Sequence, residues 1–138
     1  MVFSSTADDS GWVASPFPGV AYNYLKLGGS NPTVVALRRL NAGAVMPAHR
    51  HPVFERNYLI SGRARLLDGS IIEAGTYVEI APGVRHGATA IEECVFHDSY
   101  DGSLIWVEDS GVTTSVNSSG GFETLGTMNA PQSDNLDI

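Results

Sequence analysis

Hydrophobic positions recur along the chain in short alternating runs, and no stretch has the three-to-four-residue period of an amphipathic helix. Turn residues (Gly, Pro, Asn, Asp or Ser) close most of these runs, which is typical of β-strands. Asp68-Gly69 lies between two of the runs and predicts a tight hairpin. About nine short strands in series predict an all-β sandwich or barrel. The predicted strands cover residues 20–27, 33–40, 54–60, 63–67, 70–74, 76–80, 86–90, 93–98 and 104–108.

A chain of 138 residues suits one domain with a core of useful size. Residues 1–11 are small and polar, and we expect a flexible N-terminus there. The barrel itself is predicted over residues 12–111. Residues 112–138 are polar and are predicted to be a partly ordered tail, anchored by Phe122 and Leu125.

Charge and composition narrow the possible partners. The net charge is -7, which disfavours nucleic acid and anionic membranes because both would be repelled. Cys94 is the single cysteine and lies in an apolar run, so we expect a buried, unreactive thiol. No apolar run is long enough to span a bilayer, and no signal-like leader is visible, so a cytoplasmic protein is expected.

The candidate chemistry lies in two segments. His49 and His51 are two residues apart, so on a strand their imidazoles share one face. Glu55 opens the next strand, and the turn at Pro82-Gly83 is able to return His86 toward the pair. Imidazoles with a carboxylate suit one divalent ion such as Fe, Mn, Ni, Co or Zn. The alternative is a metal-free barrel in which a histidine acts as acid–base catalyst.

These segments resemble the two conserved motifs of the cupin superfamily. The first matches as Gly43-x5-His49-x-His51-x3-Glu55-x6-Gly62, and the second as Gly75-x6-Pro82-Gly83-x2-His86. The second motif departs in the spacing of its proline and in having Ala90 where asparagine is usual. The resemblance implies a single-domain conical β-barrel of jelly-roll type, with one metal inside and a homodimeric assembly.

A narrower resemblance is to the acetylacetone-cleaving cupins, a group with 2,4'-dihydroxyacetophenone dioxygenases and the cupin half of certain anti-sigma factors. It rests on softer motifs, namely Trp12, Phe17-Pro18-Gly19-Val20, Leu37-Arg38-Arg39-Leu40, Gly75-Thr76-Tyr77-Val78 and the segment 102–109. The resemblance implies Fe(II), O₂ and cleavage of a carbon–carbon bond next to a carbonyl. The dioxygenases of the group use three histidines, whereas this chain adds Glu55, as a fourth ligand or as a base.

Four further residues are predicted to reach the pocket by strand parity. Arg38 would hold a substrate enolate or carboxylate if it points inward, and would form a surface ion pair if it does not. Asn57 and Tyr77 are candidate cavity residues, and Trp106 is a core or pocket-wall residue. His97 is expected to be structural.

The sequence therefore predicts a metal-dependent enzyme for a small enolisable carbonyl compound, with an Fe(II) dioxygenase favoured. A redox-neutral isomerase, cyclase or lyase is one alternative. A non-catalytic module that senses a metal or ligand is the other.

Overall fold

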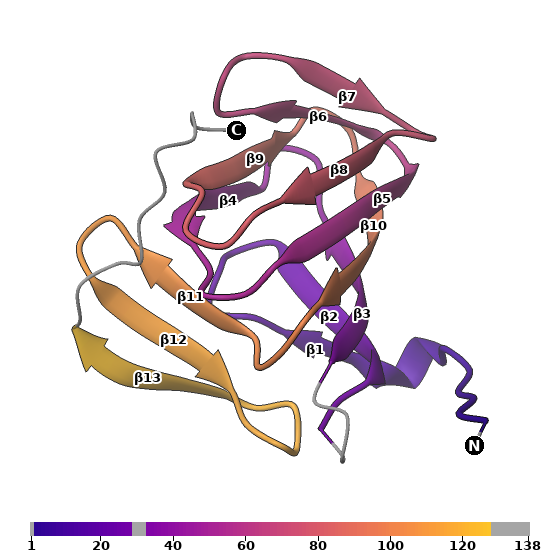
Figure 1. The fold of residues 1–138 in the computed structure, drawn as a ribbon. Helices are drawn as coiled ribbons and strands as arrows, with labels where there is room; N and C mark the ends of the chain where they lie inside the picture. Colours follow the sequence, from indigo (N-terminus) through magenta and orange to yellow (C-terminus); the bar gives the residue numbers. More distant parts are fainter. Residues whose placement is uncertain (1, 29–32, 128–138) are drawn as a thin grey trace.

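The computed structural model describes residues 2–28 and 33–127. It contains one short 3₁₀ helix, η1 (Asp9–Gly11), followed by strands only (Figure 1). The first seven strands are β1 (Trp12–Ala14), β2 (Val20–Lys26), β3 (Val34–Leu40), β4 (Val45–Arg50), β5 (Glu55–Ser61), β6 (Arg63–Leu66) and β7 (Ile71–Glu73). The others are β8 (Tyr77–Ile80), β9 (His86–Ala90), β10 (Cys94–Tyr100), β11 (Ile105–Glu108), β12 (Val112–Val116) and β13 (Phe122–Thr127).

The strands form two antiparallel sheets that enclose the core. One sheet has the order β1-β2-β3-β10-β5-β8, and the other has the order β13-β12-β11-β4-β9-β6-β7. In the middle of each sheet, paired strands are distant in sequence. For example, β10 lies between β3 and β5, and β4 lies between β11 and β9. This arrangement confirms the predicted all-β barrel. The hairpin at Asp68-Gly69 is also confirmed, with the amide of Gly69 donating to the Leu66 carbonyl.

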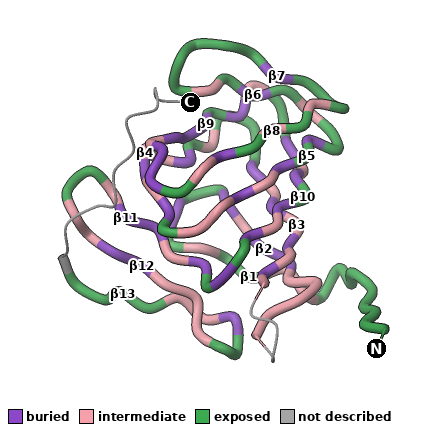
Figure 2. The backbone as a smooth tube through the Cα atoms, viewed as in Figure 1, coloured by how far each residue is buried: buried purple, intermediate pink, exposed green. Residues whose placement is uncertain are grey.

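Alternation along the strands decides which side chains face inward (Figure 2). In β3 every second residue is buried, and Arg38 is among them. In β10 the same alternation buries Asp98 and leaves His97 exposed. In β5 it buries Glu55 and Asn57. Three neighbouring strands thus place polar side chains inside the barrel.

The C-terminal part departs from the prediction, because the sheet continues past residue 111. β12 pairs with β11, and β13 pairs with β12. The threonine and serine residues of 112–116 gave no hydrophobic alternation from which this strand could be predicted, although Thr113 and Thr114 are buried. Phe122 contacts the core, with its ring 5.7 Å from that of Trp106, whereas Leu125 is half exposed. Residues 128–138 of the predicted tail lie outside the described residues.

The N-terminal segment predicted to be flexible makes specific contacts with β2. The Ser5 hydroxyl donates to the carbonyl of Leu25, and the Asn23 amide donates to the carbonyl of Asp8.

No helix among the described residues has the length and apolar character that crossing a bilayer requires.

Gly62, between β5 and β6, is a position where only glycine fits. Its φ is +91°, and an added Cβ would lie 2.1 Å from the carbonyl oxygen of Glu93. We expect Gly62→Ala to lower the free energy of unfolding by at least about 3 kcal/mol, because strain and a backbone clash add. Gly43→Ala is the matched control: its φ is +83° with nothing within 4 Å, so only about 1 kcal/mol is expected. Urea denaturation measures both, and equal losses would contradict the clash.

Candidate metal centre

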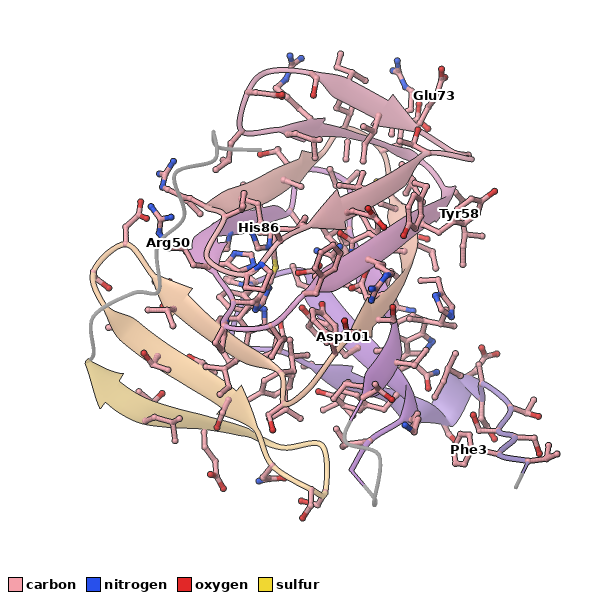
Figure 3. The ribbon with its side chains drawn as sticks, in the orientation of Figure 1. Phe3, Arg50, Tyr58, Glu73, His86 and Asp101 are labelled. Carbon is pink, nitrogen blue, oxygen red and sulfur yellow. The ribbon has the colours of Figure 1, made fainter. Side chains whose placement is uncertain are left out.

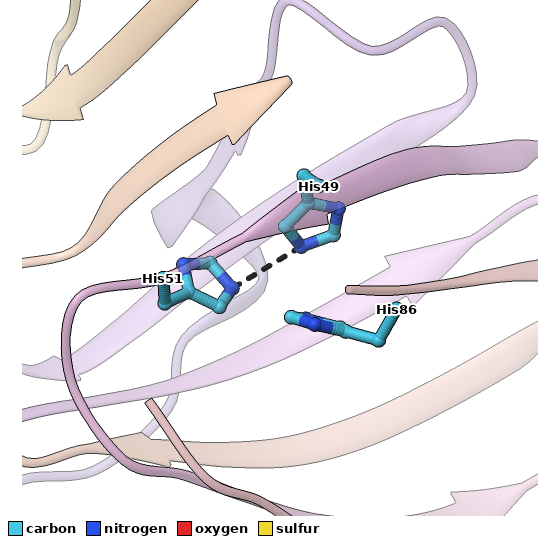
Figure 4. A group of neighbouring side chains, drawn as sticks. All are labelled: His49, His51 and His86. Atoms are coloured by element: carbon cyan, nitrogen blue, oxygen red, sulfur yellow. Dashed lines mark hydrogen bonds between the residues drawn. The ribbon is translucent and has the colours of Figure 1, made fainter. Parts of the chain in front are cut away.

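Three histidines and one glutamate meet inside the barrel. Figure 3 marks the place of His86 in the fold, and Figure 4 shows His49, His51 and His86 with their rings turned toward one another. His49 lies in β4 opposite His86 of β9, while His51 follows the end of β4 and Glu55 begins β5. His49 Nε2 is 3.1 Å from His51 Nε2, and Glu55 Oε1 is 2.8 Å from His51 Nε2 and 3.3 Å from His86 Nε2. The ligand atoms of the three histidines lie within 4.8 Å of one another, and all four side chains are buried.

The backbone sets the tautomer of each imidazole. The Nδ1 atom of His49 is 2.6 Å from the Pro47 carbonyl, and that of His51 is 2.6 Å from the Ile105 carbonyl. His86 Nδ1 lies 2.9 Å from the carbonyl of the residue two before it. A carbonyl oxygen only accepts, so each Nδ1 carries the hydrogen. In a neutral ring Nε2 then presents its lone pair to the centre, which is the arrangement that metal-binding imidazoles adopt.

When the three rings are neutral, three imidazole lone pairs and a carboxylate oxygen face one another without a donor between them. Glu55 Oε1 and His86 Nε2 are fully buried and have no good hydrogen-bond partner among the described residues. Burying such atoms unpaired is costly. A divalent cation at their centre removes this cost, and nitrogen with carboxylate oxygen is a donor set that first-row transition metals and zinc accept. The residues present therefore fit a metal ion.

The electrostatics of the four residues agree with this interpretation. Burial and the neighbouring His86 and His51 hold the pKa of His49 well below its usual range, so its imidazole is neutral. Burial raises the pKa of Glu55, but the adjacent His51 and His86 outweigh burial and bring that pKa well below its usual range, so Glu55 is a carboxylate. A carboxylate and a neutral imidazole are the protonation states that metal ligation requires.

The pKa of His49 makes the metal-free protein sensitive to acid. The unfolded chain takes up a proton at this residue below about pH 6.5, whereas the folded chain does not. Stability is therefore complete above pH 6.5 and falls as the pH is lowered, by up to about 1.4 kcal/mol per unit. Thermal unfolding in chelator at pH 7.5 and 5.5 measures the fall. In His49→Gln the fall should be smaller, and an unchanged pH dependence would contradict the assignment.

A buried polar network holds Glu55 from behind. The Nδ2 group of Asn57 donates to Glu55 Oε2 at 2.7 Å and to Asp98 Oδ1 at 2.5 Å. Asp98 Oδ2 is 2.7 Å from Arg38 Nε and also accepts from the Tyr100 hydroxyl at 3.2 Å. Burial raises the pKa of Asp98 and Arg38 opposes the rise, but every contact of this carboxylate is with a donor, so we treat it as ionised. The amide of Asn57 thus separates two buried carboxylates.

A cavity of about 30 Å³ adjoins the ligands, where one water needs roughly 10–15 Å³. Its polar lining consists of His49, Glu55, His86, Asn57 and Arg38. Its apolar lining consists of Met46, Leu66, Ile72, Val78, Ile80, Ala88 and Phe96, with Gly87. A small ligand inside it would contact the metal ligands on a mostly apolar surface.

Two of the four predicted pocket residues, Arg38 and Asn57, line this cavity. The other two do not. Tyr77 lies opposite Tyr58 on the outer face of the sheet, where it is 55% exposed and donates to Glu79. Trp106 is fully buried in the core, and its ring centroid is 6.3 Å from that of His51.

Sequence reasoning missed the part that Asp98 plays in the site. Of the adjacent pair His97 and Asp98, only His97 carries an expectation from the sequence, and His97 is exposed. Alternation carried the available signal, because an outward His97 on a strand requires an inward Asp98. The expected burial of Cys94 is confirmed, and its thiol donates to the Arg63 carbonyl.

Comparison with known proteins agrees with this architecture. Acetylacetone dioxygenase from Acinetobacter johnsonii has a TM-score of 0.66 at 20% identity, over 92% of this chain and 87% of that chain. An RmlC-like cupin protein from Ralstonia eutropha has a TM-score of 0.65 at 20% identity, over 89% of this chain and 80% of that chain. The anti-sigma factor ChrR of Rhodobacter sphaeroides, solved in complex with SigE, has a TM-score of 0.56 at 22% identity, over 65% and 48%.

At these identities the solved structures establish a shared fold. No protein of curated function matches the sequence. The model of the ChrR cupin-like domain matches residues 2–101, which is most of the chain and includes every histidine of the cluster. The chain therefore belongs to the ChrR cupin-like family of the cupin superfamily.

Proposed function

We propose that the protein is a metal-dependent enzyme that acts on a small enolisable carbonyl compound, and that it is an Fe(II) dioxygenase. The observation that carries the proposal is the convergence of three lone pairs and Glu55 Oε1 beside a small cavity. The acetylacetone dioxygenase fold, which covers most of this chain, supports this choice of chemistry.

A divalent metal at this site would supply Lewis-acid chemistry that acidifies the C–H group between two carbonyl groups, and Fe(II) would add reactivity toward O₂. His49, His51 and His86 would hold the ion through Nε2, because the backbone carbonyls fix the three rings. Glu55 presents Oε1 to the same centre while Asn57 occupies Oε2, so the carboxylate is oriented for one-oxygen ligation. The apolar walls keep bulk water from an enolate.

Metal analysis followed by oxygen uptake tests this proposal. Protein purified without added metal should contain iron as its main metal. The iron-loaded protein should consume O₂ with acetylacetone or a hydroxyaryl ketone and release two carbonyl products. Absence of uptake with fully iron-loaded protein across such a panel would overturn the dioxygenase assignment.

Glu55→Gln separates the two roles of the glutamate. If Glu55 is a ligand, the variant loses metal affinity, because an amide oxygen is a weaker donor than a carboxylate. If Glu55 is a base, the variant keeps its metal and loses turnover. A third result would come from the parent protein. If it holds its metal and exchanges substrate protons with water but takes up no O₂, a redox-neutral isomerase, cyclase or lyase is favoured instead.

A second candidate is a non-catalytic module that binds a protein partner. It is favoured by the structural similarity to ChrR, which was solved in complex with SigE, and by the family that these chains share. A metal-loaded protein that is inert toward every carbonyl compound, yet shows a metal-dependent change in partner binding, would favour this alternative. The homodimer expected from the cupin resemblance stays a prediction.

A further inference from the structure

Arg38 is a charged group inside the cavity that metal ligation leaves unused. Its side chain is 8% exposed, and it lines the same cavity as His49, Glu55 and His86. The guanidinium carbon lies 4.4 Å from the centroid of the Phe96 ring, so the ring supports the cation from one face. A buried arginine is rare in a core unless it is paired.

The pairing of Arg38 is incomplete. Nε lies 2.7 Å from Asp98 Oδ2, and Nη2 donates to Asp98 Oδ1 at 3.3 Å. For Nη1 we find no hydrogen-bond partner among residues 2–28 and 33–127. Because Arg38 lines the cavity, an Nη1 group without a protein partner is able to donate to a ligand there. Guanidinium N–H groups are suited to carboxylate oxygens.

The charges around the cavity lead to the same conclusion. Its described residues and the network behind them bring one positive charge, Arg38, and two negative charges, Glu55 and Asp98. The three histidines are neutral when their Nε2 atoms hold a metal. A divalent ion therefore leaves the buried site with a net charge of about +1, which is costly in an apolar surrounding. A carboxylate neutralises it as the ligand binds, whereas a diketone brings no charge until its C–H bond is ionised.

On the basis of the proposed function, we infer that the substrate is a small keto acid whose carboxylate accepts a hydrogen bond from Arg38 Nη1. The keto oxygen then faces the metal ligands. A neutral diketone of the same length lacks the group that Arg38 would bind, so the site should prefer the acid. The small volume of the cavity favours acids of few carbon atoms.

Two ligands of equal length test the inference. Acetoacetate and acetylacetone differ in that a carboxylate replaces one acetyl group. Calorimetric titration of the Zn(II)-loaded protein measures binding alone, because zinc has no redox chemistry. We expect acetoacetate to bind at least about tenfold more tightly than acetylacetone, because a charge-assisted hydrogen bond typically strengthens binding by about this factor. Arg38→Met should abolish this preference.

Arg38→Met leaves Asp98 unpaired and is at risk of failing to fold, so Arg38→Met/Asp98→Asn is measured beside it. Asp98→Asn alone keeps Arg38 and should keep the preference. Arg63→Met is the matched control, because Arg63 pairs with Glu92 on the surface, and it should bind both ligands as the parent does. Equal affinities in the parent, or a preference that survives in the double variant, would overturn the inference while leaving acetylacetone binding and the proposed function intact. Zinc-loaded protein that binds neither ligand would overturn both.

Discussion

Replacing His86 with alanine is expected to lower the affinity for Fe(II) or Zn(II) by at least about 100-fold. Losing a residue that only hydrogen-bonds to a metal ligand already lowers metal affinity about 10- to 100-fold. In His86→Ala a ligand itself is lost, so the effect should be larger. The fold should persist, because β9 stays paired with β4 and β6 on both sides. The removal takes away one atom that had no hydrogen-bond partner, but it also leaves the buried carbonyl of Val84 without the donor that His86 Nδ1 supplied. We therefore expect a modest loss of stability, of about 1–3 kcal/mol, in the metal-free protein.

His97→Ala is the matched control for that variant. His97 is the one histidine outside the cluster, and it is exposed on β10. Competition with a chromogenic chelator should give the parent affinity for His97→Ala and a greatly weakened one for His86→Ala. Similar affinities for the two variants would mean that the metal is held elsewhere, and would remove the observation on which the proposed function rests.

The ligands could be predicted because their positions depend on local spacing. The two-residue interval of His49 and His51 fixes a shared face, and a glycine-proline turn before His86 is enough to return the chain. The all-β class followed from the alternating runs in the same way. Both are properties that a few consecutive residues determine: the structure confirms the all-β class and brings the three histidines together.

The pocket could not be predicted in the same way, because its lining depends on the register between strands that are distant in sequence. Tyr77 appeared able to reach the cavity until its pairing with the outward Tyr58 placed it outside and Val78 inside. Asp98 gained its importance only when β10 inserted between β3 and β5, which brought it beside Asn57 and Arg38. The pairing of β10 between two strands distant in sequence cannot be predicted from a pattern in consecutive residues.

The same insertion makes Asp98 the residue whose loss should destabilise the fold most. In Asp98→Ala, the Arg38 guanidinium stays buried without its counter-ion, and the Asn57 amide and Tyr100 hydroxyl lose an acceptor. Breaking a buried ion pair from one side costs about 3–5 kcal/mol. That is a large part of the 5–15 kcal/mol that folds a typical domain. Urea denaturation of the metal-free protein measures the loss.

Removing both charges should be far milder than removing one. Asp98→Leu/Arg38→Met replaces the ion pair with apolar side chains, and such replacements of buried pairs are often neutral or stabilising. We therefore expect the double variant to regain most of the stability that Asp98→Ala loses. Its surface counterpart, Arg63→Ala/Glu92→Ala, should change stability by less than about 1 kcal/mol because that pair is exposed. If the double variant is as unstable as Asp98→Ala, the cost lies in the lost hydrogen bonds to Asn57 and Tyr100, and the isolated charge of Arg38 is not its source. If the double variant is stable but prefers no keto acid, the buried pair is retained for ligand binding at no benefit to the fold.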